Sequence, residues 1–139
     1  MKMKLLSLGF RTAAESANPT DREQRYLDCI EQIRNAKEAW TLCVEDGDSV
    51  VMDACGKECI CLWPNRDAVQ HFLQEVPSEG MPYRVGMDEL MQVSKELAEE
   101  GEYAYIVSPA ATSGCVVSPQ QFWEDLTGED LTLMPRRNR

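Results

Sequence analysis

Three cysteines that lie close together, Cys55, Cys59 and Cys61, are the residues whose type and spacing suggest chemistry most directly. With His71, the only histidine of the chain, they could supply the thiolate and imidazole ligands that zinc prefers. The spacing argues against a zinc site, because structural sites usually pair their cysteines across a tight turn, whereas Cys59 and Cys61 fall in a predicted strand. Buried structural thiols are the favoured interpretation, and a redox pair of Cys55 and Cys59 across the turn at Gly56 is an alternative.

His71 is also the natural candidate for a general base near neutral pH. It stands between Val69 and Phe72 in a predicted helix, and no serine or cysteine occurs at a spacing that would identify a nucleophile for it. The sequence therefore assigns no catalytic residue, and we expect His71 to be a partly exposed helix residue.

Aromatic residues are the candidates for binding a ligand or partner. Trp40, Trp63 and Trp123 each stand at the boundary of a predicted element. A tryptophan that precedes a proline at a strand end tends to be partly exposed, so we expect Trp63, Pro64 and Tyr83 to line a groove, with Trp40 as a further binding residue. The alternative, which the usual burial of tryptophan favours, is that the three tryptophans meet in the core.

Composition limits the classes of function. The chain has 139 residues, 43% of them apolar and 27% charged, which is typical of one soluble globular domain. Its net charge of −10 disfavours nucleic acid and anionic membranes as partners and suits a basic protein partner. The apolar stretch near the N-terminus is too short for a signal peptide, so we expect a cytoplasmic protein with reduced cysteines and no cofactor.

The first half of the chain predicts an antiparallel meander. Residues 40–44 alternate as in a strand, and the Asp46-Gly47-Asp48 turn leads to a second strand at 50–52. A glycine turn then returns the chain to a third strand over 59–63, which Pro64 ends because proline cannot donate to a sheet.

The second half predicts strands that lead into helices. Asn65 can cap a helix that carries Val69 and Phe72, and a short strand at 83–85 precedes a helix that Gly101 ends. Residues 103–107 have little polar alternation, so this strand should be covered on both faces. A last strand at 115–117 precedes a helix with Ser118 as cap and Pro119 in its first turn.

These elements predict an α+β fold: a single compact domain with a mixed or antiparallel sheet, an N-terminal β-meander and about four helices. Residues 1–19 should form an arm or short strand, residues 20–130 the domain, and residues 131–139 a C-terminal tail.

Several short motifs follow one another in a recognisable order: Arg25-Tyr26, Ala39 to Leu42, the acidic glycine hairpin, Leu62 to Pro64 before Asp67-Ala68, and Val117 to Pro119 before Phe122. This order resembles the bacterial domain-of-unknown-function family 2750 over most of residues 20–127. The architecture is similar to the SseB-type domain, in which strands enter helices after turns that contain proline or threonine. Neither resemblance implies a catalytic residue.

The sequence therefore predicts a non-enzymatic interaction or regulatory domain that binds another protein through an aromatic groove or a sheet edge, as a monomer or homodimer. The alternative is a small thiol-redox or metal-binding protein centred on Cys55, Cys59 and Cys61.

Overall fold

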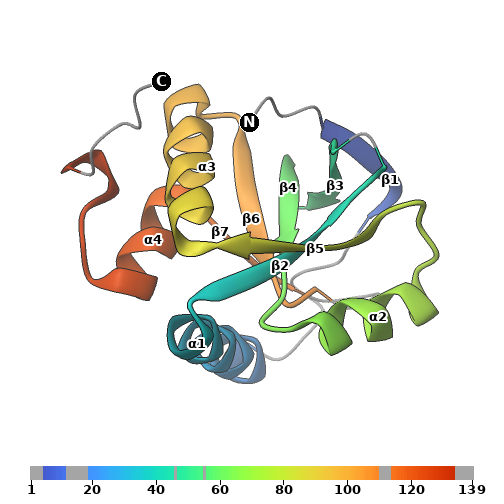
Figure 1. Ribbon diagram of the computed structural model, residues 1–139, viewed down its shortest axis with the longest axis horizontal. Coiled ribbons are helices and arrows are strands. Elements are labelled where there is room, and N and C mark those ends of the chain that lie inside the picture. Colours follow the sequence, from blue (N-terminus) through green and yellow to red (C-terminus); the bar gives the residue numbers. More distant parts are fainter. Residues whose placement is uncertain (1–4, 12–18, 46, 55, 110–113, 134–139) are drawn as a thin grey trace.

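A computed structural model describes residues 5–11, 19–45, 47–54, 56–109 and 114–133, with side chains from Glu23 onward (Figure 1). The helices and strands follow one another as β1 (Leu5–Arg11), α1 (Pro19–Ala36), β2 (Glu38–Cys43), β3 (Ser49–Ala54), β4 (Lys57–Leu62), α2 (Arg66–Glu75), β5 (Met81–Gly86), α3 (Met87–Glu100), β6 (Tyr103–Val107), β7 (Cys115–Val117), α4 (Pro119–Thr127) and a final 3₁₀ turn, η2 (Leu131–Leu133). The α+β prediction is confirmed.

The sheet is mixed, with the strand order β5-β2-β3-β4-β6-β7 and β1 beside β3. The predicted meander is confirmed, because β2 pairs with β3 and β3 with β4, both antiparallel. The parallel pairs are β1 with β3 and β4 with β6. In Figure 1, β2 and β5 run across the direction of β4 and β6.

Strand β2 leaves β3 soon after their hairpin. The two strands pair only at Cys43 and Ser49, whereas β2 pairs with β5 along its whole length. On its other side β2 meets the chain just beyond β4, where Trp40 and Trp63 form an isolated antiparallel bridge. This bridge connects β2 to the segment between β4 and α2.

Two hydrophobic clusters cover the two faces of the sheet. Along β4, Ile60 and Leu62 join the cluster under α1, α3 and α4, while Cys59 and Cys61 join the cluster under α2. This alternation is the ordinary period of a strand with both faces covered. Strand β6 contributes to both clusters as well, which confirms that it is central.

The helix ends follow the sequence signals closely. Asn65 caps α2 by accepting a hydrogen bond from the backbone of Ala68, and Ser118 caps α4 in the same way. Gly101 ends α3 with a left-handed backbone, φ 73°, a conformation that glycine adopts without steric cost.

The predicted boundaries need small changes at both ends. Helix α1 begins at Pro19, one residue before the predicted start of the domain at residue 20, and residues 5–11 form the strand that was one of two alternatives for the N-terminal segment. Leu131 is buried in the core, so the packed domain extends one residue beyond the predicted limit at residue 130. Among the described residues, none of the helices has the length and apolar character needed to cross a membrane.

Candidate functional site

An open groove of about 480 Å³ lies between α1 and α2 and is here called the α1–α2 groove. In Figure 1, α1 is seen nearly end-on and α2 runs across the view, both below the sheet. The groove lining comes from α1, from the turn between β4 and α2, from α2, and from the chain just after β6. These residues are Arg25, Trp63, Pro64, Asn65, Asp67, Ala68, His71, Phe72, Glu75, Ser108 and Pro109.

The α1–α2 groove lies at the carboxyl ends of the parallel strands β4 and β6. The last register pair of these strands is Leu62 with Val107, and both chains then turn away from the sheet into the groove wall. In sheets that contain parallel strands, ligands commonly bind outside such carboxyl ends, where diverging connections leave a crevice. The position of the groove is therefore one that favours binding.

Ser108 is held in an unusual backbone conformation at this edge. Its φ of 50° lies in the left-handed region, which residues other than glycine adopt rarely. Two hydrogen bonds fix it: its N–H donates to the carbonyl of Leu62 at 2.7 Å, and its carbonyl accepts from Nη2 of Arg25 at 2.9 Å. Its hydroxyl forms a hydrogen bond with the thiol of Cys29, a residue of α1.

Trp63 forms the floor of the groove and belongs to the core. Only 2% of its surface is exposed, so the expectation of a partly exposed side chain is not met. Its ring packs on Phe72, with centroids 5.0 Å apart, and its indole N–H donates to the carbonyl of Pro109 at 3.2 Å. Pro64 is half-buried at the groove rim.

Helix α2 supplies a polar wall. Asp67, His71 and Glu75 follow one another at intervals of four residues, so they form one stripe along the helix, and all are exposed and line the groove. Asp67 also stands in the first turn, where a negative charge interacts favourably with the helix dipole. His71 is thus a surface residue of α2.

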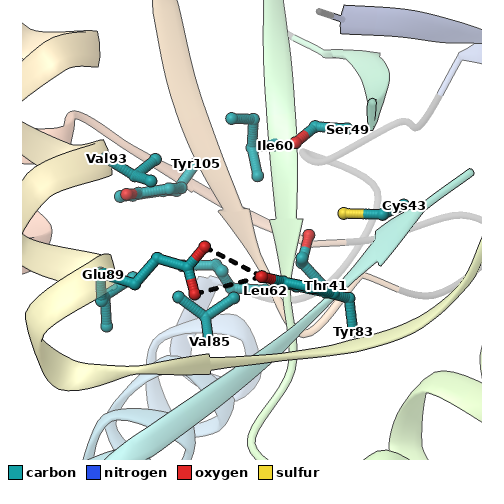
Figure 2. Close-up of a pocket in the computed structure, with 11 residues that line it drawn as sticks. Thr41, Cys43, Ser49, Ile60, Leu62, Tyr83, Val85, Glu89, Val93 and Tyr105 are labelled. Atoms are coloured by element: carbon teal, nitrogen blue, oxygen red, sulfur yellow. Dashed lines mark hydrogen bonds between the residues drawn. The ribbon is translucent and has the colours of Figure 1, made fainter. Parts of the chain in front are cut away.

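Tyr83 lies at a second, much smaller hollow on the other face of the sheet (Figure 2). This cavity has a volume of about 20 Å³, enough for about one water molecule. The Tyr83 hydroxyl donates to the carboxylate of Glu89 at 3.1 Å. Burial raises the pKa of Tyr83, and this hydrogen bond raises it further. The sheet therefore separates Tyr83 from Trp63 and Pro64, and the three residues do not share one groove.

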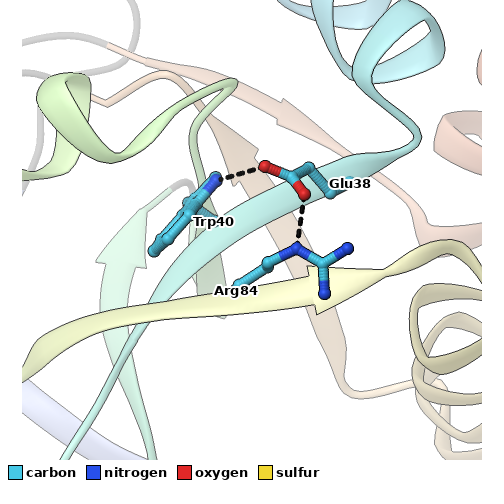
Figure 3. A network of polar contacts seen from close by, with 3 residues as sticks. All are labelled: Glu38, Trp40 and Arg84. Atoms are coloured by element: carbon cyan, nitrogen blue, oxygen red, sulfur yellow. Dashed lines mark hydrogen bonds and ion pairs between the residues drawn. The ribbon is translucent and has the colours of Figure 1, made fainter.

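Trp40 shares the α2 side of the sheet with Trp63 but does not line the groove. Its indole N–H donates to Glu38 at 3.1 Å, and the other oxygen of the same carboxylate accepts a hydrogen bond from Arg84 (Figure 3). The Arg84 guanidinium, and then the Trp40 indole, lower the pKa of Glu38. Trp123 packs in the opposite cluster, so the three tryptophans do not meet.

The cysteines do not converge on a reactive site within the described residues. Cys59 and Cys61 are fully buried on the α2 face of β4, and burial raises the pKa of the Cys61 thiol far above its usual range. The Cys59 thiol faces the backbone carbonyls of Ala54 and Lys57 at 3.9 and 3.7 Å. Cys55 lies outside the described residues. Nowhere in the described ranges do three or more metal-ligating side chains gather.

The described cysteines are free thiols. Cys29, Cys43, Cys59 and Cys61 are buried, which confirms the favoured interpretation for these residues, and Cys115 is half-buried. A thiol that is desolvated in this way has little thiolate at neutral pH, and the thiolate is the nucleophile and the metal ligand. The burial of these four thiols thus favours a structural role in the core over a redox or metal-binding role.

A sheet edge was the other surface expected to bind a partner, and β5 forms one edge of the sheet. The backbone N–H and C=O of Trp40 point toward Trp63, at the end of β4. Backbone groups of successive strand residues point to opposite sides, so those of Thr41 point toward β5, where Tyr83 is its partner. Pro82 and Arg84 must then present their backbone groups at the free edge. Proline has no N–H to donate, and a charged neighbour further discourages pairing, so this edge is protected against strand addition.

Sequence reasoning missed Arg25, Asp67, Glu75 and Ser108 as groove residues. The interval of four residues from Asp67 through His71 to Glu75 was a usable signal, because it places these side chains on one stripe of a predicted helix. Arg25 and Ser108 gave no such signal, because only the parallel pairing of β4 with β6 brings residue 108 beside α1.

A family model described as protein of unknown function, DUF2750, matches residues 26–126. The chain belongs to this family. The match spans the α1–α2 groove of this DUF2750 protein from Trp63 to Pro109, and Arg25 lies one residue before it. No curated protein and no solved structure gives a significant match to the chain. The likeness to the SseB-type domain stays a prediction.

Proposed function

We propose that this DUF2750 protein is a non-enzymatic, cytoplasmic interaction domain that binds a segment of another protein in the α1–α2 groove. The observation that carries the proposal is the groove itself: an open hollow of about 480 Å³ with an aromatic floor, charged walls and a position at the carboxyl ends of two parallel strands. The free thiols of the described cysteines support a reducing compartment.

The shape of the groove favours an extended peptide segment over a compact small molecule. Its α2 wall runs from Asp67 to Glu75, which are eight positions apart. At a rise of about 1.5 Å per residue this wall is about 12 Å long, the length of three to four residues of an extended chain. Apolar atoms of Pro64 and Ala68 offer packing beside the charges.

The groove offers no matched nucleophile and base among the described residues that line it. His71 is exposed on α2, and the hydroxyl of Ser108 is bonded to the Cys29 thiol rather than aimed at an imidazole. A general base needs its proton donor within hydrogen-bond reach. This arrangement supports binding over catalysis.

Site-specific photocrosslinking tests the proposal. A benzophenone amino acid replaces His71 in the groove, and the control variant carries it at Glu124, an exposed position on α4. Both variants are expressed in the cells that produce the protein and are irradiated. We expect a discrete protein adduct from position 71 and none from position 124. Identical adducts from both positions, or none from position 71, would overturn the proposal.

A further inference from the structure

We infer that the occupant of the α1–α2 groove is a basic peptide segment, whose lysine or arginine side chains pair with Asp67 and Glu75. This inference rests on the proposed function and gives its partner a chemical class. The two carboxylates are exposed, stand on the same stripe of α2 and line the groove at its two ends. Basic side chains about 12 Å apart on an extended segment, four residues from one another and therefore on the same face, would meet both.

The opposite wall already binds a guanidinium. Arg25 donates from Nη2 to the carbonyl of Ser108 at 2.9 Å, and the left-handed backbone of Ser108 helps to present that carbonyl at the groove. The Ser108 carbonyl thus lies on this wall, and the carboxylates of Asp67 and Glu75 lie on the α2 wall. Such acceptors are the groups that ammonium and guanidinium ions need.

The charged groups at the groove favour a cation over an anion. They are Arg25, Asp67 and Glu75. The first turn of α2 would attract an anion, but Asp67 already supplies negative charge there. Arg25 directs part of its guanidinium to the Ser108 carbonyl. The two carboxylates belong to a chain of net charge −10, and the negative potential of the protein attracts basic segments toward the groove.

The hydrophobic floor would hold the stems of the basic side chains. Lysine and arginine bury their methylene stems on apolar surface while the charged ends stay hydrated. Pro64 and Ala68, which are half-buried, provide that surface, and the buried ring of Phe72 lies beneath it. A segment of this kind would gain packing as well as charge pairing, so its binding would not depend on charge alone.

Fluorescence anisotropy with two labelled peptides tests the inference. Both peptides have an alanine–serine background; one carries two arginines four residues apart, so that both side chains lie on the same face of an extended chain, and the other carries two glutamates at the same positions. We expect the arginine peptide to bind, to be released by added salt, and to compete with an unlabelled copy, while the glutamate peptide does not bind. Absence of arginine-peptide binding, or tighter binding of the glutamate peptide, would overturn the inference.

Two variants of equal charge separate the groove from the overall field. Asp67→Asn with Glu75→Gln neutralises the groove wall, and Glu100→Gln with Glu102→Gln neutralises two exposed acids at the end of α3, away from α2 in Figure 1. Both pairs change the net charge by the same amount. We expect the groove pair to weaken arginine-peptide binding about tenfold and the α3 pair to change it less than about twofold. Equal weakening by both pairs would show attraction to net charge and would overturn the inference.

The two proposals can fail separately. If the photocrosslink at position 71 forms while the arginine peptide does not bind, the groove binds a protein segment of other chemistry, and only the inference of a basic segment is overturned. Thermal unfolding of the Asp67→Asn and Glu75→Gln variant checks that the groove is intact, which exposed polar replacements should leave almost unchanged.

Discussion

Trp40 and Trp63 are joined through their backbones, with each N–H donating to the carbonyl of the other at 2.9 and 2.8 Å. Their side chains lie on the same face of the sheet but find different partners. The indole of Trp63 donates to the buried end of the chain after β6, at Pro109, whereas that of Trp40 donates to Glu38 near the surface. The pair offers a comparison between a buried and a half-buried indole in one structural unit.

Replacing Trp63 by phenylalanine should destabilise the fold more than the same change at Trp40. Trp63→Phe leaves the carbonyl of Pro109 without its donor in a buried place, which costs about 1–3 kcal/mol, and also removes buried ring volume. At Trp40 the lost partner is a carboxylate that water can reach, so we expect a loss below about 1 kcal/mol. Urea unfolding followed by circular dichroism gives both values, and equal losses would contradict the assignment of Trp63 as the structural floor.

The buried thiols of β4 should resist alkylation while the protein is folded. Cys59 and Cys61 are fully buried, and burial raises the pKa of Cys61, so neither access nor thiolate is available at neutral pH. Iodoacetamide treatment under native conditions, followed by peptide mass spectrometry, should leave both unmodified, and concentrated guanidinium chloride should make them react. Rapid native modification of Cys61 would instead support the thiol-redox alternative. Cys115, which is half-buried, serves as an internal comparison.

Local sequence signals predicted the elements of this fold well. Proline, glycine and asparagine mark the helix ends near Pro64, Asn65 and Gly101, because these residues act on the backbone through fixed φ, missing donors or short side chains. The apolar run of β6 likewise predicted a central strand, since a strand covered on both faces needs no polar alternation.

The site was harder to predict because it depends on which face a strand presents. Trp63 follows β4 directly and Tyr83 lies in β5, and both are aromatic, but their side chains lie on opposite faces of the sheet. Their relation is decided by the pairing of β2 with β5 and by the bridge at Trp40, which are contacts between distant parts of the chain. A shift of one residue in such a register exchanges the faces, so sequence alone does not determine which aromatic residues meet.

The hydroxyls of Ser94 and Tyr105 should show a strong mutual dependence. They lie 2.7 Å apart, and both residues are fully buried in the core under α3. Removing either partner leaves the other hydroxyl desolvated without this bond, whereas removing both leaves no unmatched group from the pair. In a double-mutant cycle, Ser94→Ala and Tyr105→Phe should each destabilise the protein, with a coupling of about 1 kcal/mol. Strictly additive losses would mean that the hydroxyls find other partners.

The stability of the protein should fall at alkaline pH, and Cys29 should account for part of the loss. Burial, partly offset by the hydrogen bond from Ser108, raises the pKa of Cys29 from about 9 to about 11. The folded state therefore holds this proton more tightly than the unfolded state. The resulting stabilisation is complete below pH 9 and is lost progressively between about pH 9 and pH 11.

Urea unfolding at a series of pH values measures this effect. A shift of this size corresponds to roughly 3 kcal/mol when the titration is complete. Cys29→Ala lowers the stability at neutral pH through the lost packing, but it should make the decline between pH 9 and pH 11 less steep because one titrating thiol is gone. Cys43 and Cys61, whose thiol pKa values burial also raises, and Tyr26, whose pKa is raised by burial and by its hydrogen bond to Asp125, should maintain the remaining decline in both proteins. If the wild type and the variant lose stability in parallel from pH 9 to pH 11, the thiol of Cys29 is not buried in the folded state as the structure has it.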